Sequence, residues 1–254
     1  FQYWADGTGA TGLWGWVGYL EMVGDYWVDP ADSAYAELGF TEPYEGSLQD
    51  GYSPTLDTCL LGVGAYDPPT YYDTGAAVIT LTSGTRTIAL VPQPLAPGAF
   101  SADVLEPLDQ VLPGAVYDLD PVAGSADWPG FDVPAAVQVP PAFAVTGPDL
   151  DAADPPLVGK NQLTFTWEGA AGDFVALYLV RMIGGTTPDV SVTCAATDDG
   201  SFTVPGSIWP EWDAGDYVFV QLGRVYESSG ALPHDNSDNR LAGIYWVMGA
   251  VEAR

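Results

Sequence analysis

The fold is decided by Leu163-Thr164-Phe165-Thr166-Trp167 and by the strand-like runs that follow it as far as Val220. Leu163, Phe165 and Trp167 alternate with threonines, which is the period-two pattern of a β-strand with one buried face. Residues 174–180 are then apolar at every position, as expected of a central strand that is covered on both faces. Together these runs predict core strands of an immunoglobulin-type β-sandwich.

The same alternation continues along the C-terminal half of the chain. Val190, Val192 and Cys194 alternate with polar residues, and Asp198-Asp199-Gly200 supplies a turn. Strands are also expected at residues 142–146, 202–204, 217–220 and 241–251. Seven short strands at this spacing are typical of such a sandwich.

The N-terminal half has a less regular pattern. Strands are expected at residues 12–22, apolar on both faces, and at 26–28, whereas residues 31–53 suggest a long loop with one helical turn at 33–38. Residues 76–91 predict a β-hairpin around Ser83-Gly84 that pairs Ile79 with Ile88 and Ala77 with Leu90. Further strands are expected at 99–104, 115–119 and 131–139, and we place a domain boundary near Pro140-Pro141.

Several short motifs resemble those of known β-sandwich families. The run from Val111 to Tyr117 (VLPGAVY) resembles the turn and tyrosine that enter the sixth strand of fibronectin type III and related Ig-like domains, and residues 212–218 resemble a looser version. Residues 163–167 resemble the second strand of such domains, with Trp167 as the core tryptophan. The layout around Cys59 and Cys194 is similar to that of uncharacterised secreted bacterial proteins with tandem Ig-like domains.

This resemblance implies an all-β chain of two tandem Ig/fibronectin-III-like β-sandwiches. Residues 1–140 would form an irregular sandwich with an aromatic-rich N-terminal extension, and residues 141–254 a seven-stranded one. It also implies a secreted, extracellular or cell-surface location. Because the sequence starts at Phe1 without a methionine, we expect it to begin on a processed or trimmed chain.

The charge balance restricts the partners. The chain carries 34 acidic residues against 6 lysines and arginines, a formal charge of −28. Such a surface repels nucleic acid and anionic lipid headgroups, which excludes both as partners. The longest apolar run, residues 174–180, is far shorter than a membrane-spanning segment, so no membrane insertion is expected. The charge fits solubility in an extracellular medium, or acidic side chains that bind divalent cations or a cationic partner.

The two cysteines leave two alternatives open. A Cys59–Cys194 disulfide would close a loop of more than half the chain and stabilise it by up to ~5 kcal/mol in the chain-entropy model. Cys194 also lies on the same strand face as Val190 and Val192, so a buried free thiol is equally consistent with the pattern.

Acidic loops suggest calcium sites. Asp235, Ser237, Asp238 and Asn239 bring oxygen donors together in one loop, although the glycine and terminal glutamate of an EF-hand are missing. Two further candidate groups are Asp149, Asp151 and Asp154, and Asp118, Asp120 and Asp127. In each case the alternative is a solvated acidic loop, and no other cofactor is expected.

Tryptophans are the candidate contact residues. Trp14, Trp16 and Trp27 in the first half, and Trp209 with Trp212 in the second, would form an aromatic platform for sugars or a patch for another subunit. Core packing is the alternative for Trp14 and Trp16, and it is equally consistent with the loop that holds Trp209 and Trp212.

The sequence predicts a protein that is not an enzyme. His234 is the only histidine, and there is no serine-nucleophile, zinc-binding or phosphate-binding motif. Paired carboxylates for glycoside hydrolysis would occur by chance among 34 acids. We therefore expect a structural or adhesive subunit of a bacterial cell surface or extracellular assembly, which self-associates or binds other surface proteins, as a filament would through exchange of the strand at residues 12–22. The alternative is a carbohydrate-binding module with an aromatic platform and a calcium site.

Overall fold

The computed structural model describes residues 12–24, 31–41, 49, 52–62, 76–94, 96–102, 109–122, 131–169, 172–231 and 238–254. Over these residues the protein is all-β. The first half contains β1 (Gly12–Met22), β2 (Ser33–Thr41), β3 (Thr58–Leu61), β4 (Ile79–Ser83), β5 (Arg86–Gln93), β6 (Ala96–Ser101), β7 (Val116–Val122) and β8 (Phe131–Gln138). The second half contains β9 (Val145–Gly147), β10 (Leu157–Val158), β11 (Thr164–Trp167), β12 (Phe174–Ile183), β13 (Thr187–Ala196), β14 (Ser201–Thr203), a 3₁₀ turn (Gly206–Ile208), β15 (Tyr217–Ala231) and β16 (Asp238–Ala253).

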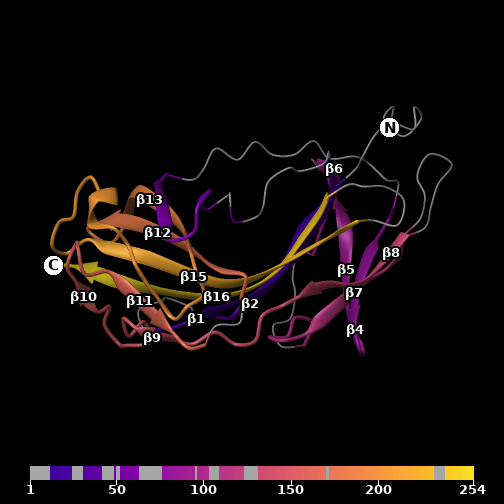
Figure 1. Cartoon of the computed structure of the whole chain (residues 1–254), viewed down its shortest axis with the longest axis horizontal. Helices are drawn as coiled ribbons and strands as arrows, with labels where there is room; N and C mark the ends of the chain where they lie inside the picture. Colours follow the sequence, from indigo (N-terminus) through magenta and orange to yellow (C-terminus); the bar gives the residue numbers. More distant parts are fainter. Residues whose placement is uncertain are drawn as a thin grey trace.

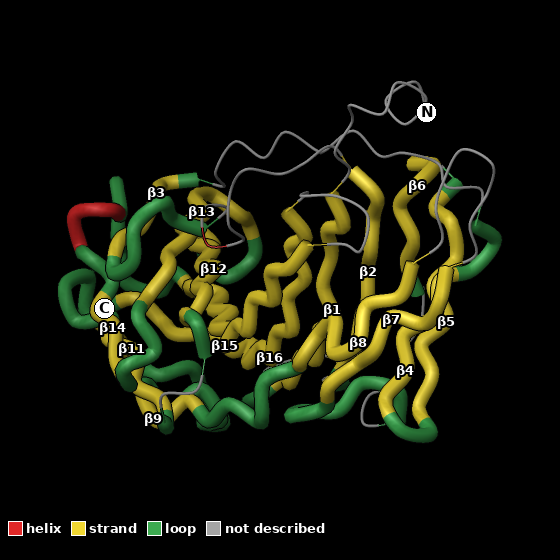
Figure 2. The backbone as a smooth tube through the Cα atoms, turned by 45° about the vertical axis from the view of Figure 1, so that its right-hand side comes forward, coloured by secondary structure: helices red, strands yellow, loops and turns green. Residues whose placement is uncertain are grey.

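One long mixed sheet runs through both halves of the chain (Figures 1 and 2). Its order is β3-β13-β12-β15-β16-β1-β2-β6-β5-β4-β7-β8, and β10 pairs with β16 beside that path. In Figure 1 the strands of the second half lie on the left and β4 to β8 on the right, with the long hairpin of β15 and β16 running between them. Both hairpin strands extend well beyond the predicted residues 217–220 and 241–251.

Strand β1 connects the two halves. It lies parallel to β16, from Trp14 opposite Arg240 to Met22 opposite Met248, and antiparallel to β2 on its other side. Strand β3, also from the first half, pairs with β13. The predicted boundary near Pro140-Pro141 therefore does not separate two sheets: strand pairing links residues 1–140 and 141–254 within one sheet.

The core lies between this sheet and a second sheet of three strands, β14-β11-β9. Leu163, Phe165 and Trp167 of the decisive stretch are buried, as their alternation predicts, and belong to one cluster with Val175 and Leu177 of β12. The same cluster continues into the first half through β4, β5, β7 and β8. The observed architecture is thus sandwich-like, with a continuous hydrophobic core. Among the described residues, no helix has the length and apolar character needed to cross a membrane.

Two local predictions need correction. The hairpin of β4 and β5 exists, but it pairs Ile79 with Leu90 and Ser83 with Arg86, so the turn is Gly84-Thr85 and the predicted pairs are wrong by two residues. Gly84 has φ +61°, which a two-residue hairpin turn with glycine at its first central position requires. A turn placed one residue earlier shifts every pair by two.

The predicted loop and helical turn at residues 31–53 are also wrong, because residues 33–41 form β2. Ala36 and Leu38 of this strand are buried in the core, and the strand is paired over nine residues with β1. Pairing with β1 thus overrides a weak local pattern. The strand expected at residues 26–28 lies outside the described residues.

Candidate functional site

Strand β12 sends alternate side chains to opposite faces of the long sheet. Val175, Leu177 and Leu179 are fully buried in the core beneath the three-stranded sheet. Phe174 and Ala176 point the other way and belong to a second, smaller hydrophobic cluster. We call this second face of β12, β15 and β16 the outer face.

One end of the outer face is covered by the chain itself. Tyr52 and Leu56 pack on a cluster that comprises Phe174, Ala176, Ala195, Val225, Ala242, Ile244 and Trp246. The ring centroid of Tyr52 lies 6.4 Å from that of Phe174 and 6.0 Å from that of Trp246. The Trp246 indole N–H donates to the Tyr35 hydroxyl at 2.6 Å. An aromatic and aliphatic segment therefore fits this face well.

A disulfide holds the covering segment in place. Cys59 of β3 lies directly opposite Cys194 of β13 and is bonded to it, which decides between the two alternatives that the sequence leaves open. Asp57 adds two contacts just beyond the end of β13, where it accepts hydrogen bonds from the backbone N–H and the hydroxyl of Thr197 at 2.8 and 2.9 Å.

The other end of the outer face carries an open apolar groove of about 450 Å³. We call it the outer groove; it is lined by Tyr178, Val180, Met182, Pro188, Phe219, Gln221 and Met248. Strand register brings these residues together, because Val180 lies opposite Phe219 and Gln221 lies opposite both Tyr178 and Met248. None of the lining residues is charged, although the chain as a whole carries a charge of −28.

Sequence reasoning did not find this groove. The run at residues 174–180 is apolar at every position and predicts a strand covered on both faces. In the structure, β12 is covered on both faces only near Phe174, and its outer face is open from Tyr178 onward. The position where the cover ends depends on β3 and the disulfide, so local sequence carries no signal for it. One hint of an uncharged surface is the run Phe219-Val220-Gln221-Leu222, which contains no charged residue although the chain has 34 acids.

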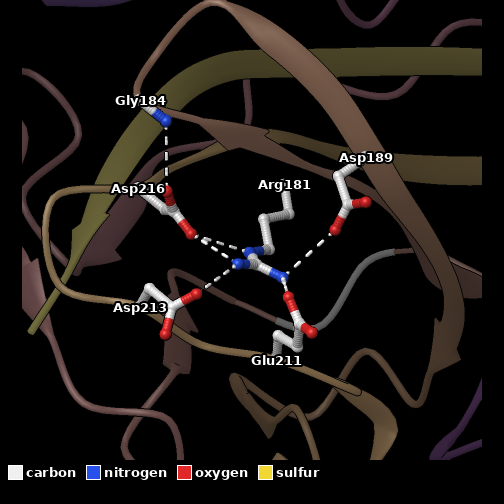
Figure 3. A network of polar contacts seen from close by, with 6 residues as sticks. All are labelled: Arg181, Gly184, Asp189, Glu211, Asp213 and Asp216. Atoms are coloured by element: carbon white, nitrogen blue, oxygen red, sulfur yellow. Dashed lines mark hydrogen bonds and ion pairs between the residues drawn. The ribbon is translucent and has the colours of Figure 1, made fainter.

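On the core side of β12, Arg181 is buried among four carboxylates (Figure 3). Asp216 accepts from Nε at 2.8 Å and lies 2.7 Å from Nη2. The other three carboxylates lie at 3.1 Å (Asp189), 3.4 Å (Glu211) and 3.0 Å (Asp213) from the guanidinium nitrogens. The Arg181 side chain is 2% exposed, whereas those of Glu211 and Asp213 are 69% and 74% exposed.

Asp216 is the carboxylate that balances this buried charge. A hydrogen bond from the Gly184 backbone N–H, at 3.1 Å, and the Arg181 guanidinium together hold the pKa of Asp216 below its ordinary value, despite its burial. For Arg181, burial disfavours the charge, but the hydrogen bond and charge of Asp216, followed by those of its other acidic neighbours, raise its pKa overall. This arrangement fixes β12, its turn into β13 and the loop before β15 to one another, and its role is structural.

The predicted aromatic platform is only partly available. Trp209 is 1% exposed and packs against the half-buried Trp212, with ring centroids 5.4 Å apart, so it offers no ring face to a sugar. Trp209 therefore belongs to the core and not to an exposed aromatic platform. Within the described part of the chain, neither indole N–H has a hydrogen-bond partner. Trp16 is half-buried beside the outer cluster, the Trp14 side chain is not described, and Trp27 lies outside the described residues.

The structure describes only part of each of two predicted calcium sites. Asp235 and Ser237 lie outside the described residues, and Asp238 and Asn239 begin β16 with undescribed side chains, so this site stays a prediction. Asp118 accepts from the Ala135 N–H at 2.6 Å and Asp120 from the Thr82 hydroxyl at 2.7 Å, while Asp127 is outside the described residues. Across the described ranges, no three acidic, histidine or cysteine side chains form a metal-binding group.

Asp149 and Asp151 line a different feature, a cavity of about 490 Å³ that also includes Glu21, Glu168 and Tyr245, whereas Asp154 is not among its lining residues. The Tyr245 hydroxyl donates to Glu21 at 2.7 Å, and the Tyr245 and Tyr19 rings stack with centroids 5.1 Å apart. Burial raises the pKa of both tyrosines, and the hydrogen bond of Tyr19 to Asp32 and that of Tyr245 to Glu21 raise it further. The cavity lies between β1, β16 and the loop before β10, and four carboxylate side chains are among its lining residues.

Comparisons with known proteins add no family assignment. No family model and no curated protein matches the chain. Among solved structures, the yeast delta-COP-I mu-homology domain is similar at a TM-score of 0.21 and 10% identity, over 96% of each chain. A likeness at this level carries no argument about fold or function.

Proposed function

We propose that this protein is a non-enzymatic structural or adhesive subunit of a bacterial cell surface or extracellular assembly, and that the outer groove is its contact surface. The observation that carries the proposal is the neutrality of the groove. Seven uncharged residues form an open apolar surface on a molecule with a charge of −28. Charged residues are depleted at the centres of protein–protein contacts, and the lining of the outer groove contains none.

The architecture supports a scaffold built from Ig-like units. Strands β14, β11 and β9 face β13, β12, β15 and β16, which is the division into two sheets of an Ig-like sandwich. In the first half, the Tyr117 hydroxyl donates to the Gln110 carbonyl at 2.7 Å and accepts from the Leu112 N–H at 3.0 Å. This contact resembles the tyrosine corner of Ig-like folds. We infer two Ig-like units that share a sheet through β1 and β16.

The disulfide supports an extracellular location. Structural disulfides persist in oxidising compartments and are rare in the cytosol. Cys194 is fully buried and Cys59 half-buried, so their bond serves the packing of β3 on β13. The large negative charge would in turn keep a surface-exposed protein soluble between contacts.

The pairing of β1 is the reason that we propose the outer groove, and not β1, as the contact surface. This strand is already paired on both sides within its own chain, along nine residues with β16 and nine with β2. Its exchange with a neighbour would break both pairings, whereas contact through the outer groove breaks none. A glycan-binding role rested on the loop tryptophans, and the burial of Trp209 gives it no support.

Electron microscopy of the purified protein, together with its mass in solution, tests the proposal. We expect filaments, sheets, rings or defined oligomers, and the same assemblies after treatment with a calcium chelator, because the outer groove contains no carboxylate. Isolated monomers with and without chelator, at every protein concentration, would count against a structural role. Assemblies that dissolve in chelator would instead point to the predicted calcium loop.

A further inference from the structure

The cavity beside β1 and β16 differs from the outer groove in both position and chemistry. Tyr245 and Val247 line it from β16, and both belong to the main core cluster. Their neighbours Ile244 and Trp246 belong instead to the cluster on the outer face. The cavity, about 490 Å³ in volume, therefore lies on the inner face of the long sheet, and a ligand bound in it would leave the outer groove free.

Carboxylates from three separate segments converge on this cavity. They belong to Glu21 of β1, to Asp149 and Asp151 of the loop before β10, and to Glu168 just after β11. Two of them are held by hydrogen bonds. Glu21 accepts from the Tyr245 hydroxyl at 2.7 Å, and Asp151 accepts from the Gly24 backbone N–H at 3.3 Å. The fold thus collects negative charge from distant parts of the chain around one hollow and orients part of it.

The part of the chain that the structure describes does not supply a counter-charge to these carboxylates. Its ion pairs are made by Arg181 and Arg224, and neither arginine pairs with a carboxylate of the cavity. Arg224 lies 4.6 Å from the ring centroid of Phe143, a lining residue, but its guanidinium is paired with Asp198 at 2.8 Å. Four like charges around one hollow create a potential that favours a cationic ligand.

The remaining lining restricts the kind of cation. Across the described ranges no three acidic side chains form a group that could hold a metal ion, so the cavity carboxylates are too dispersed to share one. Much of the wall between them is apolar, and it includes Val23, Val145, Leu150 and Val247. A flexible cation with several charged groups can reach separate carboxylates while its methylene groups contact this apolar wall.

We propose that this cavity binds an aliphatic polyamine, a chain of methylene groups that carries several ammonium groups. An ammonium group has donors and no acceptor, whereas an ionised carboxylate only accepts, so the two are complementary. Charge-assisted hydrogen bonds of this kind are stronger than neutral ones. The inference does not rest on the proposed function, because the outer groove lies on the other face of the sheet and its lining contains no carboxylate.

Isothermal titration calorimetry with spermidine tests the site. The wild-type protein should bind spermidine with a dissociation constant that rises as NaCl is added, because salt screens the attraction. Asp151→Asn removes one lining carboxylate and should raise the dissociation constant about 10-fold. The matched control is Asp154→Asn, the same change in the same loop at an exposed residue that does not line the cavity. It should alter the dissociation constant by less than about two-fold.

Two further measurements separate binding in the cavity from a diffuse attraction to an acidic surface. Ala144→Trp places a bulky ring in the lining without changing the charge, and it should abolish most of the binding. Because Ala144 is exposed, the variant should keep the wild-type Tm. Hexaamminecobalt(III) carries the same charge as spermidine but has no methylene groups, so it should bind the wild-type protein more weakly.

The polyamine site is overturned if the wild-type protein does not bind spermidine. It is also overturned if Asp154→Asn weakens binding as much as Asp151→Asn, or if Ala144→Trp binds as the wild type does, because the cavity would then not be the site. Equal affinity for hexaamminecobalt(III) and spermidine would overturn it as well, since the apolar wall would then play no part. None of these results affects the proposed function, which is tested by assembly through the outer groove.

Discussion

At the scale of single residues, Arg181 shows how one buried charge organises an end of the sandwich. Its four acidic neighbours are not equivalent, because Asp216 is buried and makes the shortest contacts, whereas Glu211 and Asp213 are mostly exposed. Exposed ion pairs contribute little to stability, since water screens them. The buried pair is the one that the fold depends on.

Asp216→Asn should lower the free energy of unfolding by about 2 kcal/mol, because it weakens hydrogen bonds to a buried charged group. Asp213→Asn removes a carboxylate that is 74% exposed and should change stability by less than about 1 kcal/mol. Urea unfolding of the two variants measures the difference. Equal losses would contradict the unequal roles of the two carboxylates.

The same residue gives a pH dependence. Since its pKa is lower in the folded protein than in the unfolded chain, Asp216 stabilises the fold above the unfolded pKa of about 3.9, and this contribution disappears as the pH falls through the folded value. The gap in unfolding free energy between wild type and Asp216→Asn should therefore be full at pH 7 and narrow below about pH 4. If this difference in unfolding free energy grew as the pH fell, the pKa of Asp216 would be raised by folding and not lowered.

At the scale of elements, local patterns predicted strands better than their partners. The buried alternation of Leu163, Phe165 and Trp167, and the central position of β12, follow from spacing alone. The strand predicted at residues 115–119 lies within β7, and the Tyr117 hydroxyl in it bonds to the backbone of Gln110 and Leu112. Strand β2 was missed because its stability comes from β1 rather than from its own periodicity.

The candidate site was less accessible to sequence than the strands were. The outer groove depends on which part of a uniformly apolar strand is covered, and the cover is a segment more than a hundred residues away in sequence. Trp209 sits in a loop, where spacing does not distinguish burial from exposure. The extent of the cover over β12 and the burial of Trp209 both depend on residues distant in sequence, so they are visible only in the packed structure.

The disulfide of β3 can be tested for its role in holding Tyr52 and Leu56 on the outer face. Strand β3 has four residues and is held to β13 by ladder hydrogen bonds and the Cys59–Cys194 disulfide. Reduction should lower the free energy of unfolding by about 2–5 kcal/mol and loosen Tyr52 and Leu56 from the outer cluster. Tryptophan emission should then shift to longer wavelength as water reaches Trp246. Unchanged stability and emission after complete reduction would show that the cover holds without the bond.

At the scale of the whole molecule, the two halves of the chain are joined by more than β1. Gly243 of β16 lies so close to the backbone of β8 that an added Cβ would overlap the Gln138 carbonyl and its neighbours. Gly243→Ala should therefore destabilise the protein by about 1–3 kcal/mol through overpacking. Thermal unfolding measures this loss. If the variant were as stable as the wild type, β16 and β8 could move apart at Gly243 without cost.

One sheet runs through both halves of the chain, and the outer groove lies on this sheet. Differential scanning calorimetry of the intact protein tests this shared sheet most directly. A shared sheet and core predict one cooperative transition, with equal calorimetric and van't Hoff enthalpies. Two separate transitions, one of them reproduced by residues 141–254 alone, would contradict the shared sheet.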